Sequence, residues 1–252
     1  MNQNEKSENR KALPRFFVTM LLSLLAGGVL GLLIGLSSVF GLDAAGFARW
    51  LDGALQAVTP WGIPVTSVLV LGAAFLLYRS AAKKFTAWDG GDEDETSESI
   101  DILLSWVLLL SSVQLLINFF FFAALATTRP NEGAFPVVGL FVLSCGLVIF
   151  AQQKAVDLTR KMNPEKCGSV YDTKFQKKWY GSMDESERQQ VGQACYRAYM
   201  VTSRFCVALW LILVVLSLVF EMSALPVFVL LLVWGVMQVT YTLECIRLSK
   251  KS

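Results

Sequence analysis

The chain alternates long apolar runs with shorter polar segments, and the first run sets the pattern. Residues 16–40 form twenty-five consecutive positions without a charge. At about 1.5 Å of rise per residue, a helix of this length crosses a hydrocarbon core of about 30 Å. The apolar region of a signal peptide spans only about 7–15 residues. The run therefore predicts a transmembrane helix that is kept in the protein.

Five more apolar runs follow, and together they predict an all-α polytopic membrane protein with six transmembrane helices. The later spans are expected at residues 62–78, 102–127, 135–151, 205–220 and 225–243. The predicted organisation is a cytoplasmic segment (1–15), helices one to four (16–151), a cytoplasmic helical linker (152–204), helices five and six (205–247) and a cytoplasmic tail (248–252).

Two segments between the early spans have their own patterns. Residues 43–58 place apolar side chains on one helical face, which predicts an amphipathic helix in the outer interface that ends at Pro60. Residues 79–101 form an acidic inner loop. A calcium-binding EF-hand starting at Asp92 would need Gly and Glu where the chain has Ser97 and Leu103, so the loop is interpreted as solvated.

Two signals divide the cytoplasmic linker. Asn163 and Pro164 form a stop signal, so the fourth helix is expected to continue as far as Met162. Ser182 and Glu185 have the spacing of a capping box, which predicts the start of a long helix that runs directly into the fifth span.

Between these signals, Asp172 can cap a short helix that carries a candidate cytoplasmic surface. The surface comprises Lys174, Phe175, Lys177, Lys178 and Trp179. The two aromatic residues are one helical turn apart and form an apolar edge, while the lysines can reach lipid phosphates. Two interpretations follow: the helix lies flat on the inner leaflet, or its edge packs on the helix of residues 182–199 as a small cap that is open to a partner.

Charge supports a topology with both termini in the cytoplasm. Of the 22 Lys and Arg residues, 20 fall in segments that the six-span arrangement places inside, and Arg49 and Arg129 fall outside. This asymmetry agrees with the positive-inside rule. The expected location is a plasma membrane.

Small residues line one face of the first span. Ser23, Gly27, Gly31 and Gly35 recur every four residues, which allows another helix backbone to approach closely. The neighbour can be another span of the same chain or a second copy in a homodimer.

Polar side chains also occur within two later spans. Gln114 and Asn118 share one face of the third span, and Trp234 and Gln238 share one face of the sixth. Such groups find no water in hydrocarbon, so they are expected to point into the bundle, where Gln238 could accept a hydrogen bond from the indole of Trp234. They serve either as interhelical contacts or as the lining of a pathway.

The linker carries a family resemblance. MNPEKCGSVYDTKFQKKW, followed by MDESERQQVGQACYRAY and then a span, resembles a family of six-span membrane proteins of Gram-positive bacteria that is defined only as a domain of unknown function. The resemblance implies a bacterial multi-pass protein and supplies no catalytic residues.

The composition argues against catalysis by this chain. With 54% hydrophobic residues, 17% charged residues and no histidine, the chain lacks the commonest general base and metal ligand. The six predicted spans contain no Asp or Glu, and the chain has no P-loop motif. Five cysteines show no metal-ligand spacing and are expected as free thiols. No catalytic residue, cofactor, metal or nucleic-acid partner is expected.

The resulting hypothesis is a non-catalytic membrane protein that acts through a partner, in an envelope-stress, immunity or export-accessory role. Its expected partners are the lipid bilayer and a second membrane protein or a homodimer. A small-solute transporter or channel is the alternative, and an intramembrane enzyme is the least favoured class.

Overall fold

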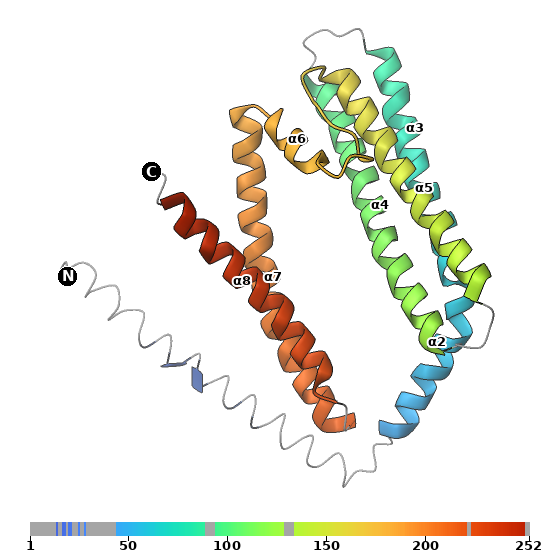
Figure 1. Ribbon diagram of the computed structural model, residues 1–252, viewed down its shortest axis with the longest axis vertical. Helices are drawn as coiled ribbons and strands as arrows, with labels where there is room; N and C mark the ends of the chain where they lie inside the picture. Colours follow the sequence, from blue (N-terminus) through green and yellow to red (C-terminus); the bar gives the residue numbers. More distant parts are fainter. Residues whose placement is uncertain are drawn as a thin grey trace, which may run out of the picture. The chain divides into compact units, whose positions relative to one another are not determined.

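The protein is described by a computed structural model over residues 44–88, 94–128, 134–220 and 223–249, with single positions between 14 and 28. In these ranges every regular element is helical (Figure 1). Five helices of the described part are long and apolar enough to cross a membrane. The chain is therefore an all-helical, multi-pass membrane protein.

Some sequence predictions fall beyond these ranges. The first span, residues 16–40, lies outside the described residues apart from the single positions. The small-residue face of Ser23, Gly27, Gly31 and Gly35 also lies outside them.

The chain divides into two compact units. We call Trp50–Arg197 the bundle unit, and we call Met1–Arg49 with Ala198–Ser252 the hairpin unit.

The bundle unit begins with one nearly continuous helix. α2 (Ala44–Thr66) passes through a π-helical turn, η1 (Ser67–Leu71), into α3 (Gly72–Ala87). The predicted helix end at Pro60 is wrong, because Pro60 lies inside α2. In membranes, side-chain hydroxyls and local π turns accommodate prolines within helices.

Two threonine hydroxyls lie near the prolines and bond to carbonyls of their own helix. Thr66 Oγ1 donates to the carbonyl of Gly62 at 2.7 Å, and Thr59 Oγ1 donates to the carbonyl of Leu55. The stop signal derives from water-soluble helices, whereas prolines are tolerated inside membrane helices, so the prediction failed here.

Helices α3, α4 (Asp94–Thr128) and α5 (Ala134–Met162) pack side by side (Figure 1). Their shared apolar core consists of Ala74, Ala81, Ile100, Leu104, Val107, Ala155, Leu158 and Met162. The helix α5 ends at Met162, as the Asn163–Pro164 signal predicted. The helix α4 begins within the predicted acidic loop, where its acids favour the positive end of the helix dipole.

A close contact fixes α2 against α4. A Cβ atom added at Gly62 would lie 2.3 Å from Cδ1 of Phe121. The missing side chain therefore lets the Phe121 ring lie against the α2 backbone.

The linker leads through α6 (Phe175–Gly181) into α7 (Glu185–Phe220). The predicted Ser182–Glu185 capping box is wrong. The box forms two residues later, because the backbone N–H of Glu187 donates to Asp184 Oδ1 at 2.7 Å and the N–H of Asp184 donates to Glu187 Oε2 at 3.1 Å. Ser182 instead donates to the carbonyl of Trp179, at the end of α6.

In the hairpin unit, the last part of α7 is followed by α8 (Leu225–Ser249). Tyr199 on α7 stacks on Tyr241 of α8, with ring centres 4.3 Å apart and planes 19° apart. No residue of α8 is fully buried among the described residues.

Candidate functional site

A cluster of uncharged polar side chains lies inside the bundle unit, within its apolar helices. We call it the polar core cluster: Thr66, Ser67, Gln114, Asn118 and Ser144. The residues come from α2, the π turn, α4 and α5, so the cluster joins the first helix of the bundle unit to α4 and α5. Gln114 and Asn118 are both 0% exposed.

Gln114 is the centre of the cluster. Its Nε2 lies 3.2 Å from Thr66 Oγ1, 3.1 Å from Ser67 Oγ and 2.8 Å from Asn118 Oδ1. An amide NH₂ group has two hydrogens, so these three acceptors share them. The Oε1 of Gln114 is buried and has no hydrogen-bond partner among the described residues.

The cluster closes through α5. Asn118 Nδ2 donates to Ser144 Oγ at 2.8 Å, and the hydroxyls of Ser67 and Ser144 lie 2.7 Å apart. Burial of Gln114 and Asn118 agrees with the expectation for amides in hydrocarbon. Their partners Thr66, Ser67 and Ser144 were not predicted, since isolated hydroxyl residues are common in apolar runs.

The polar residues of the sixth predicted span form a different contact. Gln238 Oε1 accepts a hydrogen bond from the hydroxyl of Tyr199. The Nε1 of Trp234 is buried and has no partner among the described residues, so the predicted Trp234–Gln238 hydrogen bond is wrong. The hydroxyl of Tyr199 occupies the glutamine oxygen instead of the indole. Tyr199 lies on α7, and the spacing of residues within the sixth span gives no information about contacts with another helix.

A second polar region joins the linker to the bundle. Gln153 on α5 is 7% exposed, and its Oε1 accepts hydrogen bonds from the backbone N–H of Val170 at 2.7 Å and from Ser169 Oγ at 3.0 Å. Its Nε2 donates to Asp157 Oδ1 at 2.7 Å. One glutamine side chain therefore holds the linker on the end of α5.

An ion pair holds the start of α7 against the linker. Lys166 is 6% exposed and pairs with Glu187. Asp101 of α4 is close enough for both of these charges to act on it. Sequence reasoning missed this group, because its members lie far apart in the chain.

The candidate cytoplasmic surface is partly exposed. Lys174, Lys177 and Lys178 are exposed, while Phe175 and Trp179 are half-buried with ring centres 5.5 Å apart. The predicted aromatic edge is therefore present.

Gly168 lies against the aromatic edge that Phe175 and Trp179 form. Gly168 has φ of 139°, and a Cβ atom there would lie 2.9 Å from Cδ2 of Phe175. The linker backbone thus passes directly against the ring of Phe175.

Two carboxylates stabilise the linker electrostatically. The hydrogen bond from the Lys178 ammonium, together with one from the backbone N–H of Lys174, lowers the pKa of Asp172 from its ordinary value of 3.8. Hydrogen bonds from the backbone N–H of Glu187 and the hydroxyl of Ser186 lower the pKa of Asp184.

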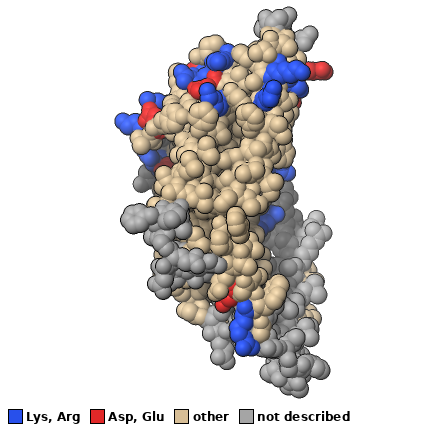
Figure 2. Space-filling model, turned by 90° about the vertical axis from the view of Figure 1, so that its right-hand side faces the viewer, with Lys and Arg blue, Asp and Glu red and all other residues tan. Residues whose placement is uncertain are grey.

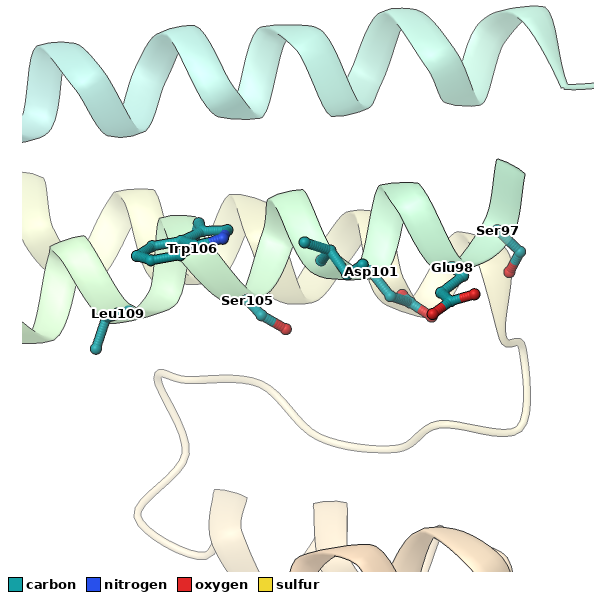
Figure 3. A pocket seen from close by; sticks show the side chains of 7 residues that line it. Ser97, Glu98, Asp101, Ser105, Trp106 and Leu109 are labelled. Atoms are coloured by element: carbon teal, nitrogen blue, oxygen red, sulfur yellow. The ribbon is translucent and has the colours of Figure 1, made fainter. Parts of the chain in front are cut away.

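Along one face of α4, acidic side chains near the start of the helix are followed by apolar side chains (Figure 3). Glu98 and Asp101 lie near the start of the helix, and Trp106 and Leu109 follow along a shallow depression of about 570 Å³. The depression is lined by this single helix, so it offers an open surface rather than an enclosed site.

Lys and Arg side chains gather at one end of the bundle unit (Figure 2). This basic end lies where α3 and α5 end and where α4 begins (Figure 1). Its basic residues on the helices are Arg79, Lys83, Lys84, Lys154, Arg160 and Lys161.

The fold and the polar core cluster define a class: a multi-pass helical membrane protein whose uncharged polar groups join its helices internally. Within that class, the chain belongs to the family described as "Protein of unknown function (DUF3169)", which matches residues 10–244. The predicted membership in a family defined only as a domain of unknown function is thereby confirmed. No curated protein and no solved structure matches the chain.

Proposed function

We propose that the protein is a non-catalytic component of a bacterial plasma membrane that acts by binding a second membrane protein. The roles that fit are envelope stress, immunity and accessory function in export. One observation carries the proposal: the intramembrane amides of the bundle unit bond to one another. Gln114 and Asn118, both 0% exposed, join helices, so neither amide is exposed to lipid.

The hairpin unit supplies the surface for such a partner. Along α8, Leu232, Val236 and Val239 are 53%, 60% and 57% exposed, and no described residue of this helix is fully buried. An apolar helix of this kind packs on another membrane helix through van der Waals contact. The absence of histidine from the sequence further supports a role other than catalysis.

The proposed topology has six spans and both termini in the cytoplasm. Its support is the distribution of 20 of 22 basic residues in the sequence. In this orientation the basic end of the bundle unit faces the cytoplasm.

Site-specific photo-crosslinking combined with purification tests the partner proposal. A photoreactive residue at Leu232, Val236 or Val239 should capture one membrane protein that also co-purifies in mild detergent. Matched probes at Val68 and Leu76, exposed positions of the bundle unit, should not capture it. Capture at all positions alike would reflect random collisions and would contradict the proposal.

A transporter or channel is the second candidate, favoured by one observation. Gln114 Oε1 is buried beside a π-helical turn without a hydrogen-bond partner among the described residues, and such turns are frequent at functional sites. Movement of a solute by the pure protein in proteoliposomes, lost in Gln114→Leu, would establish this candidate in place of the first.

A further inference from the structure

An apolar groove lies on the bundle unit between α3 and α5. Its volume is about 230 Å³. Ala74 and Val107, each 1% exposed, form its floor, and Phe75 and Phe150, 60% and 53% exposed, flank it. The small side chain of Ala151 leaves the space open between the two helices.

A polar pocket of about 420 Å³ continues the groove at the basic end. Tyr78 and Lys154 line both spaces, so the groove and the pocket are connected. The remaining residues that line the pocket are Asp157, Leu158, Arg160, Lys161 and Pro164. Since Leu158 is only 5% exposed, the pocket has an apolar floor beneath charged walls.

The charge of the pocket is positive. Lys154, Arg160 and Lys161 carry three positive charges, and in the described part of the chain no salt bridge involves any of them. Asp157, the one acid among the lining residues, accepts a hydrogen bond from Gln153. The pocket therefore retains cationic donors for an anion.

The junction between the two spaces is amphipathic. Lys154 Nζ lies 5.4 Å from the centre of the Phe150 ring, so its charge sits beside the apolar groove. Tyr78 presents an apolar ring and a phenol at the same level, an arrangement typical of residues at the edge of the hydrocarbon core.

We propose that this groove and pocket form a binding site for an anionic glycerophospholipid. One acyl chain lies along Ala74 and Ala151, and the phosphate binds Lys154, Arg160 and Lys161. Basic pockets between transmembrane helices are suited to anionic headgroups. The groove favours a lipid over a soluble phosphate, because an apolar channel gives a free anion no contact.

Binding to the purified full-length protein tests the proposal. The protein is held in a neutral detergent and mixed with phosphatidylglycerol or phosphatidylcholine that carry identical oleoyl chains. Native mass spectrometry counts the bound lipids, and tryptophan fluorescence follows thermal unfolding. We expect one phosphatidylglycerol to be retained preferentially and to raise the unfolding temperature. Equal retention of both lipids would overturn the assignment of an anionic headgroup.

Two charge variants distinguish binding at this pocket from a general attraction of anionic lipid to the positive charge of the protein. The variant Lys154→Gln/Arg160→Gln/Lys161→Gln should lose phosphatidylglycerol affinity by at least about tenfold. The matched control is Lys83→Gln/Arg197→Gln/Arg204→Gln, which loses the same charge at exposed positions outside the groove and the pocket and should bind within about twofold of the original protein. Equal losses in both variants would refute a specific site.

Filling the groove distinguishes a lipid from a free anion. Ala151→Leu keeps every charge and should weaken phosphatidylglycerol binding, whereas Ala73→Leu, at an exposed position of α3 outside the lining, should not. Should Ala151→Leu fail to fold, Phe75→Ser provides a substitution at an exposed groove position with the same expected effect. Unchanged binding in the folded groove variants, with competition by inorganic phosphate, would show a phosphate pocket and overturn the lipid proposal.

Discussion

Asn118 on α4 donates a hydrogen bond from Nδ2 to Ser144 Oγ on α5 at 2.8 Å. No water is available in hydrocarbon to replace this bond if it is lost. Hydrogen bonds between membrane helices average about 0.6 kcal/mol, but an orphaned buried partner costs a further ~1–3 kcal/mol. Loss of the bond therefore destabilises the fold mainly because it leaves buried polar groups without a partner.

Replacing Asn118 by Leu should lower the free energy of unfolding by about 1–3 kcal/mol, because Ser144 and the amide of Gln114 both lose a partner. The measurement is thermal unfolding in detergent, followed by tryptophan fluorescence. Leu116→Ala, at a position of the same helix that is 68% exposed, should have a smaller effect. An unchanged unfolding temperature in Asn118→Leu would mean that the cluster adds nothing to stability.

Gly62→Ala should destabilise the protein even though alanine normally favours a helix by about 1 kcal/mol. The added Cβ would lie 2.3 Å from the Phe121 ring, so the ring must move or α2 and α4 must separate. Gly72→Ala is the matched control, since its Cβ would meet no atom within 4 Å. We expect this control to be neutral or stabilising in the same unfolding assay. Phe121→Leu should partly rescue Gly62→Ala, and lack of rescue would contradict the proposed clash.

The successes and failures of sequence reasoning have physical causes. Hydrocarbon imposes a length and an apolar composition on each span, so the long helices could be predicted, as could the end of α5 at Met162. It also forces Gln114 and Asn118 inward. Pro60 failed as a stop signal because a proline that would end a helix in water is tolerated inside a membrane helix, and here it lies within α2.

The errors in the linker have a different origin. Ser182–Glu185 and Asp184–Glu187 both fit the spacing of a capping box, and the choice depends on Ser182 being used by the end of α6. The contacts of Gln153 with Ser169 and Val170 depend on how the linker folds back over α5. Periodicity within a segment carries no information about such contacts.

The ion pair of Lys166 and Glu187 should respond unequally to loss of either partner. Lys166 is 6% exposed and Glu187 is 37% exposed. Glu187→Gln leaves a buried positive charge unpaired, whereas Lys166→Met leaves a carboxylate that water can reach. We therefore expect Glu187→Gln to lower the unfolding temperature more. The reverse order would indicate that burial of Lys166 is not the dominant cost.

Acid should weaken the start of α7 and the linker. The lowered pKa values of Asp172 and Asp184 mean that folding favours their ionised forms. Their contribution to stability is complete above the ordinary pKa of 3.8 and is lost as the pH falls through the lower folded values. Carboxyl carbon NMR shifts of the solubilised protein should show midpoints below 3.8 for both residues. Midpoints at or above that value would contradict the hydrogen bonds described here.

Cysteine labelling tests the orientation of the chain. The five native cysteines are free thiols, and Cys167, Cys195 and Cys245 are exposed, so all five are first replaced by serine. A membrane-impermeant maleimide added to intact cells should then label a cysteine at Asn131, in the predicted outer turn, and should miss one at Lys177. Lys177 is exposed on α6, so burial would not explain a missing signal there. Permeabilised cells provide the control, because the Lys177 position should then react. Labelling at Lys177 in intact cells would place the linker outside and would reverse the topology predicted from the distribution of basic residues.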